Sequence, residues 1–186
     1  MTMKTSYLFL APGFEEIEAV TPVDVMRRAG MDVVTVSLAD TKEVTGANGV
    51  TYVADRMLAD VSLDDAEWLI VPGGLPGSTN VAANATVCEA LKAHAAKGGK
   101  VAAICAAPAF VLAPLGLLEG KRATCYPGCE VACPGVPMTG NAVEANPTLI
   151  TANGPGAALP FAYAIVANSC GEDAAEALRQ GMMYRG

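Results

Sequence analysis

The sequence predicts an α/β fold with a mostly parallel sheet and helices on both of its faces. Short apolar, often β-branched runs alternate along the chain with longer helix-like segments, which is the pattern of strand–helix–strand units. Several of these runs are apolar at nearly every position, as expected for strands that are buried on both faces. The chain has 186 residues, so we expect one domain over residues 1–186.

The predicted strands are short apolar runs that end at Gly, Pro or Asn turns. They are residues 6–10, 32–37, 68–71, 100–104, 142–144 and 149–151, with a further short strand near residues 123–124. Residues 50–53 follow an Asn-Gly turn, and we expect them to form half of a small hairpin.

The predicted helices fill the intervals between these strands. They are residues 15–28, 79–97, 107–115, 157–168 and 172–180. The first of them begins with acidic residues and ends with Arg27 and Arg28 before Gly30, as the helix dipole and a C-terminal stop favour. The alternation therefore supports a layered sheet in which chemistry is expected beyond the carboxyl ends of the strands.

Composition and charge exclude several classes of function. Lys plus Arg number 12 and Asp plus Glu number 19, which gives a net charge of −7, so we expect no nucleic-acid partner. Two charge-free stretches, 101–118 and 148–171, are interrupted by Pro, Gly and Asn, so we expect no membrane span. Six cysteines are too few for a disulfide scaffold, and residues 1–16 lack a secretory pattern. We expect a cytoplasmic protein with reduced thiols.

Cys105 is the first candidate for chemistry, because it lies directly between a predicted strand and a predicted helix. Its neighbours Ala103, Ala106 and Ala107 are small, as a sharp strand-to-helix elbow requires. A thiol at a helix N-terminus is expected to have a lowered pKa. The alternative is a buried, inert cysteine that only packs.

The group that assists this cysteine is expected to be acidic. His94 is the one histidine, and we expect it to be a surface residue on a helix that covers the sheet, away from Cys105. Glu15, Glu16 and Glu18 follow the first strand and reach the same edge of the sheet. One of them, protonated and hydrogen-bonded to the sulfur, would favour the thiolate, while the other two are expected to be solvated. Backbone amides at Gly73-Gly74 and Ala106 could stabilise an oxyanion.

Four collinear motifs make the chain similar to a known family. They are LAPGFEEIEAVTPVDVMRRAG (10–30), VPGGLPGSTNV (71–81), VAAICAAPAFVLA (101–113) and NGPGAALPFAYAIV (153–166). The chain resembles the ThiJ/PfpI superfamily, and most closely the branch of the Parkinson-disease-associated protein deglycase and bacterial YajL-like proteins. The resemblance implies a flavodoxin-like three-layer sandwich that forms a homodimer.

The resemblance also implies roles for individual residues. The reactive cysteine falls on Cys105, its acidic partner on Glu18, and the oxyanion-hole amides on Gly74 and Ala106. The residues beside the pocket or the dimer contact fall on Glu15, Asp24, Arg28 and Tyr126.

The implied activity is that of a cysteine-dependent glyoxalase or protein deglycase that needs no cofactor. Its substrates would be methylglyoxal, glyoxal or early glycation adducts, which form a hemithioacetal on Cys105. The alternative is a redox-sensing or holdase-type stress protein that uses an oxidisable Cys105.

Two features near residue 125 depart from the family pattern. Many relatives have a histidine where this chain has Tyr126, and a tyrosine does not act as a base at neutral pH, so protease or amidase chemistry is not expected. Cys125, Cys129 and Cys133 recur every four residues, but no fourth ligand is evident, so we expect no metal. Our hypothesis is that Cys125 is a resolving thiol for oxidised Cys105.

Overall fold

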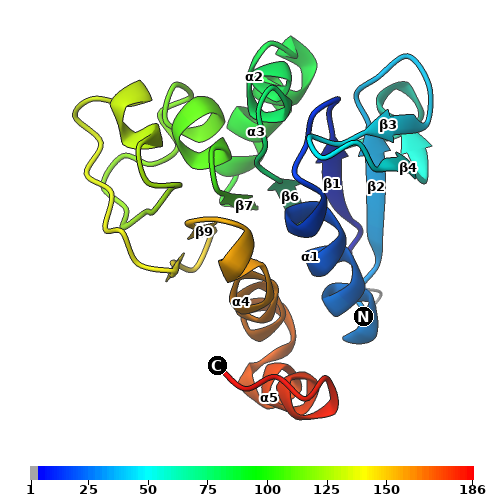
Figure 1. The fold of residues 1–186 in the computed structure, drawn as a ribbon, viewed down its shortest axis with the longest axis vertical. Helices are drawn as coiled ribbons and strands as arrows, with labels where there is room; N and C mark the ends of the chain where they lie inside the picture. The colour runs from blue at the N-terminus through cyan, green and yellow to red at the C-terminus, as the bar shows by residue number, and fades with distance from the viewer. Residues whose placement is uncertain (1–3) are drawn as a thin grey trace.

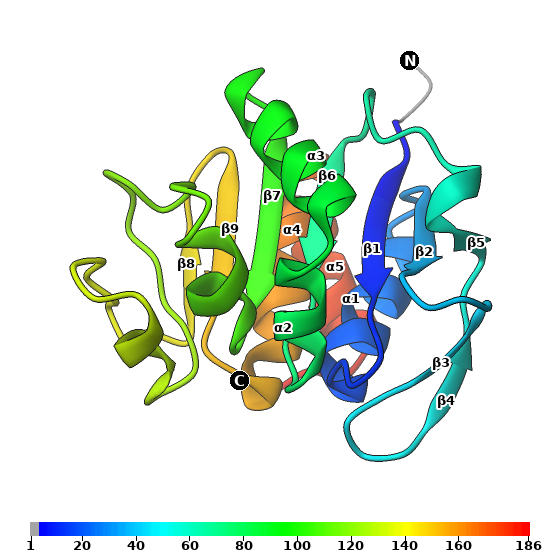
Figure 2. The ribbon, with the colours of Figure 1, turned by 90° about the horizontal axis from the view of Figure 1, so that it is seen from above.

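The computed structural model describes residues 4–186 and contains a seven-stranded sheet in the order β5-β2-β1-β6-β7-β9-β8 (Figures 1 and 2). The strands are β1 (Ser6–Leu10), β2 (Val33–Ser37), β5 (Arg56–Met57), β6 (Trp68–Val71), β7 (Lys100–Ile104), β8 (Val143–Ala145) and β9 (Leu149–Ala152). Every neighbouring pair is parallel except β8 and β9, which are antiparallel. The predicted fold class, a flavodoxin-like and mostly parallel sheet, is confirmed.

Helices cover both faces of this sheet (Figure 2). One face carries α1 (Glu16–Arg28), α4 (Ala158–Cys170) and α5 (Glu172–Gly181), and the other carries α2 (Gly77–Ala82) and α3 (Ala85–Ala96). Successive strand residues point to opposite faces: Leu8 and Leu10 pack in the core beneath α1 and α4, and Phe9 packs beneath α2 and α3. Among residues 4–186, no helix combines the length and the apolar character needed to cross a membrane.

A two-stranded arm projects beside the edge of the sheet that carries β2 (Figure 1). It consists of β3 (Glu43–Thr45) and β4 (Thr51–Val53), which pair antiparallel. The hairpin half expected at 50–53 is therefore confirmed, whereas β3 and β5 are strands that the sequence pattern did not indicate.

Three predicted elements differ in the structure. The single helix expected at 79–97 is two helices, because the Asn84 side chain accepts a hydrogen bond from Val87 N at 3.1 Å and starts α3 anew. The helix expected at 107–115 is a short π-helical segment, η2 (Pro108–Leu112), closed by Ala113 N donating to Pro108 O at 2.9 Å. Residues 123–124 form no strand and contribute only an isolated bridge between Ala123 and Met138.

The strand order places the ends of three strands at one edge. β1 lies between β2 and β6, so the direction in which strands are added reverses at β1 and β6. In open parallel sheets this reversal point is where sites form, beyond the carboxyl ends of the strands. Segments that follow β1, β6 and β7 therefore meet there.

Candidate active site

Cys105 forms a strained elbow at the carboxyl end of β7. Its φ is +64°, a left-handed conformation that a non-glycine residue rarely adopts. Two hydrogen bonds hold it: Cys105 N donates to Ala152 O, and Tyr126 N donates to Cys105 O, both at 2.8 Å. Backbone strain of this kind costs about 1–3 kcal/mol and concentrates at functional sites. The elbow expected from the small neighbours is therefore present.

Glu18 lies in the first turn of α1 and is completely buried. Its Oε2 accepts a hydrogen bond from Gly73 N at 2.8 Å. Its Oε1 has no hydrogen-bond partner among the described residues. Glu15 caps the same helix, because its Oε2 accepts from Glu18 N at 2.8 Å. The carboxyl is thus held firmly through one oxygen and left open at the other.

Gly73 separates Glu18 from Cys105 and leaves no room for a side chain. A Cβ at this position would lie 2.5 Å from Glu18 Oε2 and 2.6 Å from Cys105 Cβ. The carboxyl and the cysteine therefore lie on either side of the Gly73 backbone, with no side chain between them. Gly74 is also required as glycine, because its φ is +90° and a Cβ would lie 2.5 Å from Glu15 N. The sequence showed this Gly-Gly pair only as a weak turn signal.

Burial raises the pKa of both ionisable groups, and Glu18 adds to the rise at Cys105. Burial raises the pKa of Glu18 to about 7, with the Glu15 charge adding to the rise while the Cys105 thiol and the Gly73 amide oppose it. Burial and the negative charge of Glu18 raise the pKa of the Cys105 thiol to about 12, against the amides of Gly74 and Ala106. The lowered thiol pKa expected from the helix N-terminus is therefore wrong, because burial beside a carboxylate outweighs two amides.

The amides of Gly74 and Ala106 nevertheless act on the sulfur as hydrogen-bond donors. They come from two different strand ends, the segment after β6 and the elbow after β7. Two converging backbone N–H groups beside a nucleophile are the arrangement that stabilises a developing oxyanion.

Tyr126 lies beside the elbow and is half exposed, at 47%. It borders a cavity of about 280 Å³ together with Asn153 and Gly154, which follow β9. β9 is paired parallel to β7, so these residues reach the edge where Cys105 lies. The sequence motif contained Asn153 and Gly154, and their position directly after a strand was the signal that could have nominated them as site residues.

The remaining predicted pocket residues lie on α1. Asp24 and Arg28 are exposed and pair with each other, at 2.8 Å between Arg28 Nε and Asp24 Oδ2. Neither appears among the groups that shift the pKa of Glu18 or Cys105.

Cys125 is buried in a small apolar cluster with Ala109 and Cys133. Cys133 shifts its pKa, and Cys105 is not among the groups that do so. The role of Cys125 as a resolving thiol for Cys105 stays a prediction.

Two expectations about polar side chains are wrong. His94 is buried, at 7% exposed, and its Nε2 lies 3.2 Å from Lys100 O at the start of β7, the opposite edge from Cys105. Glu16 is buried rather than solvated, because the arm folds over it: Asn48 N and Asn48 Nδ2 donate to its carboxylate, both at 2.8 Å. Sequence pattern alone did not reveal either contact, since both partners are brought in by tertiary packing.

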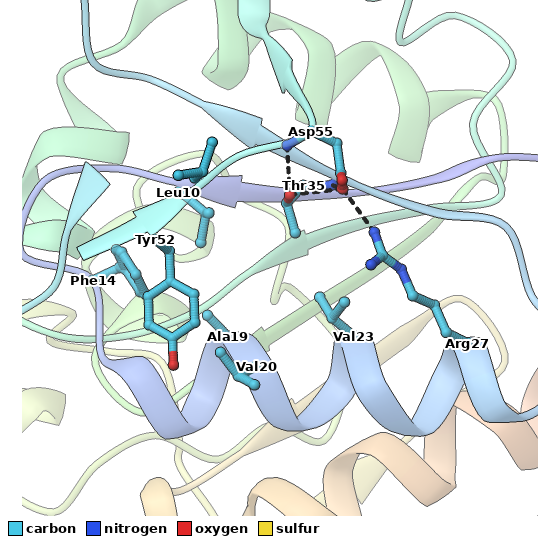
Figure 3. A pocket seen from close by; sticks show the side chains of 10 residues that line it. Leu10, Phe14, Ala19, Val20, Val23, Arg27, Thr35, Tyr52 and Asp55 are labelled. Atoms are coloured by element: carbon cyan, nitrogen blue, oxygen red, sulfur yellow. Dashed lines mark hydrogen bonds and ion pairs between the residues drawn. The ribbon is translucent and has the colours of Figure 1, made fainter. Parts of the chain in front are cut away.

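A second cavity, of about 230 Å³, lies between α1 and the arm (Figure 3). Its walls are mostly apolar, and its polar end is occupied by an ion pair between Arg27 Nη2 and Asp55 Oδ2 at 2.7 Å. Asp55 also accepts from Thr35 N at 2.8 Å. None of the lining residues is a cysteine, so the nucleophile lies elsewhere.

Within residues 4–186, no group of three His, Cys, Asp or Glu side chains could hold a metal ion.

Comparisons with known proteins agree on one family. The model of the DJ-1/PfpI family matches residues 4–168. The chain is 37% identical over 164 residues to Protein DJ-1 homolog B of Arabidopsis thaliana, covering 88% of this chain and 37% of that protein. It is 34% identical over 170 residues to Glutathione-independent glyoxalase DJR-1.2 of Caenorhabditis elegans, covering 89% of each. It spans less than half of the length of two Arabidopsis relatives.

A solved structure is similar over nearly the whole chain. It is that of oxidised Toxoplasma gondii DJ-1, with a TM-score of 0.93 and 33% identity, covering 98% of this chain and 100% of that one.

Proposed function

The chain belongs to the DJ-1/PfpI family, and on that premise we propose that it is a cysteine-dependent enzyme that converts small oxoaldehydes, or early glycation adducts, without a cofactor. One observation carries the proposal: a buried carboxyl with a pKa near 7 faces a cysteine at a strained elbow. A base with a pKa close to the working pH is the most effective proton acceptor. A glyoxalase among the similar proteins supports the same reaction class.

Glu18 acts as the base for Cys105 in this proposal. The thiol carries its proton at neutral pH, because its pKa is raised to about 12. As the sulfur attacks the aldehyde carbon, the thiol proton passes to the Glu18 carboxylate and the carbonyl electron pair moves to oxygen. The amides of Gly74 and Ala106 stabilise that oxygen until it is protonated, which gives a hemithioacetal.

The same carboxyl then moves a proton between carbons. After releasing its proton, Glu18 removes the hydrogen from the former aldehyde carbon, and the electron pair forms an enediol. Protonation of the neighbouring carbon gives a thioester, and water hydrolyses it to the hydroxy acid and the free thiol. With methylglyoxal the product is lactate. Tyr126, beside the elbow, contacts the substrate but supplies no base.

Lactate formation from methylglyoxal tests this proposal. We expect Cys105→Ser to abolish it, because serine is a far poorer nucleophile when no strong base activates it. Cys88→Ser is the matched control: Cys88 is a partly buried thiol on α3 whose sulfur faces the carbonyls of Val81 and Ala82. Unchanged lactate formation in Cys105→Ser would remove the assignment.

A redox-sensing role is the second candidate. The observation that favours it is the same carboxyl, which in its protonated form can donate a hydrogen bond to an oxygen added to the sulfur. The two candidates separate in Glu18→Gln. The amide still donates to an oxidised sulfur but cannot remove a proton, so peroxide oxidation of Cys105 would persist while lactate formation is lost.

We also propose that the working unit is a homodimer in a reducing, cytoplasmic compartment. All six cysteines are free. Exposed apolar side chains gather on α1 and the arm: Ile17 is 54% exposed, Val20 38% and Val53 69%. Asp24 and Arg28 lie on the same helix. Analytical ultracentrifugation of the wild type and of Val53→Asp tests the homodimer. We expect the wild type to sediment as a dimer and the variant as a monomer; a monomeric wild type would contradict the proposal.

A further inference from the structure

The loop between Ala123 and Met138 contains three thiols that the proposed reaction does not use. Cys125 and Cys133 are buried, at 4% and 6% exposed, and share a small apolar cluster with Ala109. Cys129 packs at the margin of this cluster and is partly exposed. The cluster is separate from the two cores that line the faces of the sheet.

Backbone turns gather these thiols. Cys129 N donates to Tyr126 O at 2.9 Å, and Cys133 N donates to Glu130 O at 3.1 Å, so two consecutive turns fold the chain back on itself. The ends of the loop are joined by the bridge between Ala123 and Met138. The cysteines therefore lie within a closed segment, where a covalent link costs little additional chain entropy.

Cys125 and Cys133 are the favoured pair among the three. Both border a cavity of about 350 Å³ that a small molecule can occupy, and Cys129 does not line it. The negative charge of a Cys133 thiolate raises the pKa of Cys125 more strongly than that of Cys129 does. Cys133 is thus the thiol that acts most strongly on Cys125.

We propose that Cys125 and Cys133 form a redox modification site, in which a low-molecular-weight disulfide oxidises the two thiols to a disulfide within the loop. Cys133 loses its proton to solvent, and its thiolate attacks one sulfur of the small disulfide; the S–S bond of that molecule breaks, the released thiolate takes up a proton, and a mixed disulfide is left on Cys133. Cys125 loses its proton and attacks the Cys133 sulfur, forming the S–S bond and releasing the second thiol. Two protein thiols are oxidised and one small disulfide is reduced to two thiols.

The surroundings keep the pair uncharged in both its reduced and its oxidised form. Burial raises the pKa of Cys125 to about 12, and neighbouring Cys133, Cys129 and Glu130 raise it further. Among the described residues, the groups that shift the pKa of Cys125 include no cation, so the thiolate is not stabilised in the way that makes a disulfide strongly oxidising. An uncharged disulfide, like the two protonated thiols, is therefore compatible with this apolar cluster, whereas a standing thiolate is not.

The pair is placed to influence the elbow. Ala109 belongs to η2, which begins three residues after Cys105. Tyr126, next to Cys125, donates its amide hydrogen to Cys105 O. A disulfide formed here would therefore restrain the loop on two sides of Cys105: at η2, through Ala109, and at the Tyr126 amide that binds Cys105 O.

Peptide mapping of the full chain tests the proposal without any aldehyde substrate, so the result does not depend on the proposed function. The protein is equilibrated with glutathione disulfide, its remaining thiols are alkylated, and it is digested with a protease that cuts after glutamate. Cleavage after Glu130 separates Cys125 and Cys129 from Cys133. We expect peptides 120–130 and 131–144 to be joined by a disulfide, with Cys129 alkylated and with separation by dithiothreitol.

Variants make the assignment specific. Cys125→Ala and Cys133→Ala are expected to lose the linked peptides, and Cys129→Ser is expected to keep them. Mapping of the wild type decides the question even if an alanine variant folds poorly. Full alkylation of all three thiols, a bond that uses Cys129, or a bond between Cys105 and Cys125 would overturn the proposal.

Discussion

Two glutamates on the first turn of α1 are both buried, yet their surroundings push their pKa values in opposite directions. Glu16 faces the arm, where burial tends to raise its pKa but donors from Asn48 and the Val50 amide prevail and lower it. Glu18 faces the elbow, where burial prevails and raises its pKa to about 7. One carboxylate receives three hydrogen bonds from the arm, whereas the other is met by one backbone amide and the Cys105 thiol.

The contrast shows that the number of donors, and not burial alone, decides the protonation state. Glu16 is ionised and fixed, so it ties the arm to α1. Glu18 retains one oxygen without a partner and can exchange a proton at neutral pH, so it suits the chemistry of Cys105. Neighbouring positions on one helix thus serve stability and reaction separately.

The largest expected difference between the two carboxyls is in activity. Glu18→Gln removes the base and should lower kcat/KM for methylglyoxal by about 10²-fold or more, the usual contribution of a positioned base. Glu16→Gln is the matched control and should change kcat/KM by much less, because its carboxyl faces away from Cys105 towards the arm. Equal losses in the two variants would break the distinction.

The pH dependence of stability should come next in size. Between pH 4.5 and 7 the folded protein keeps a proton on Glu18 that the unfolded chain has lost, so stability falls as the pH rises through this window. The shift corresponds to about 2–3 kcal/mol lost between pH 5 and pH 8. Urea unfolding at both pH values measures it, and Glu18→Gln should lose most of this dependence. The same pH dependence in the wild type and in Glu18→Gln would contradict the assignment.

Removing the charge of Glu16 should destabilise the protein directly. Glu16→Gln replaces a charged acceptor of Asn48 and Val50 by a neutral amide. Because Asn48 and Val50 are exposed and their donors can turn to water, the cost is about 0.5–1.5 kcal/mol, the usual net worth of a hydrogen bond. The contribution of Glu16 to stability changes with pH in the opposite direction to that of Glu18. It is present above the ordinary pKa of a glutamate and is lost as the pH falls through the lowered pKa of Glu16. Urea unfolding should show that Glu16→Gln has a lower free energy of unfolding than the wild type, with a larger difference at pH 7 than at pH 3. An equal difference at the two pH values would contradict an ionised Glu16.

Local patterns were sufficient to predict the main strands of the sheet and the elbow at Cys105, because strand ends and helix starts are local. They left Glu15, Glu16 and Glu18 open as partners of the cysteine, and only the family resemblance pointed to Glu18. The sequence was not sufficient for Glu16 or His94, which are buried by segments distant in the chain: Asn48 of the arm covers one, and Lys100 of β7 meets the other. The direction of the Cys105 pKa also escaped prediction, since it depends on how closely Glu18 and two amides approach the sulfur.

The most direct test of the central claim is a titration of the two carboxyl groups by NMR of protein labelled with ¹³C in its glutamate side chains. The resonances of Glu16 and Glu18 are assigned through the two glutamine variants and followed from pH 3 to pH 9. We expect Glu18 to titrate near pH 7 and Glu16 below the range of an ordinary glutamate. A Glu18 resonance that titrates together with the exposed glutamates would contradict the account, because Cys105 would then have no base poised at neutral pH.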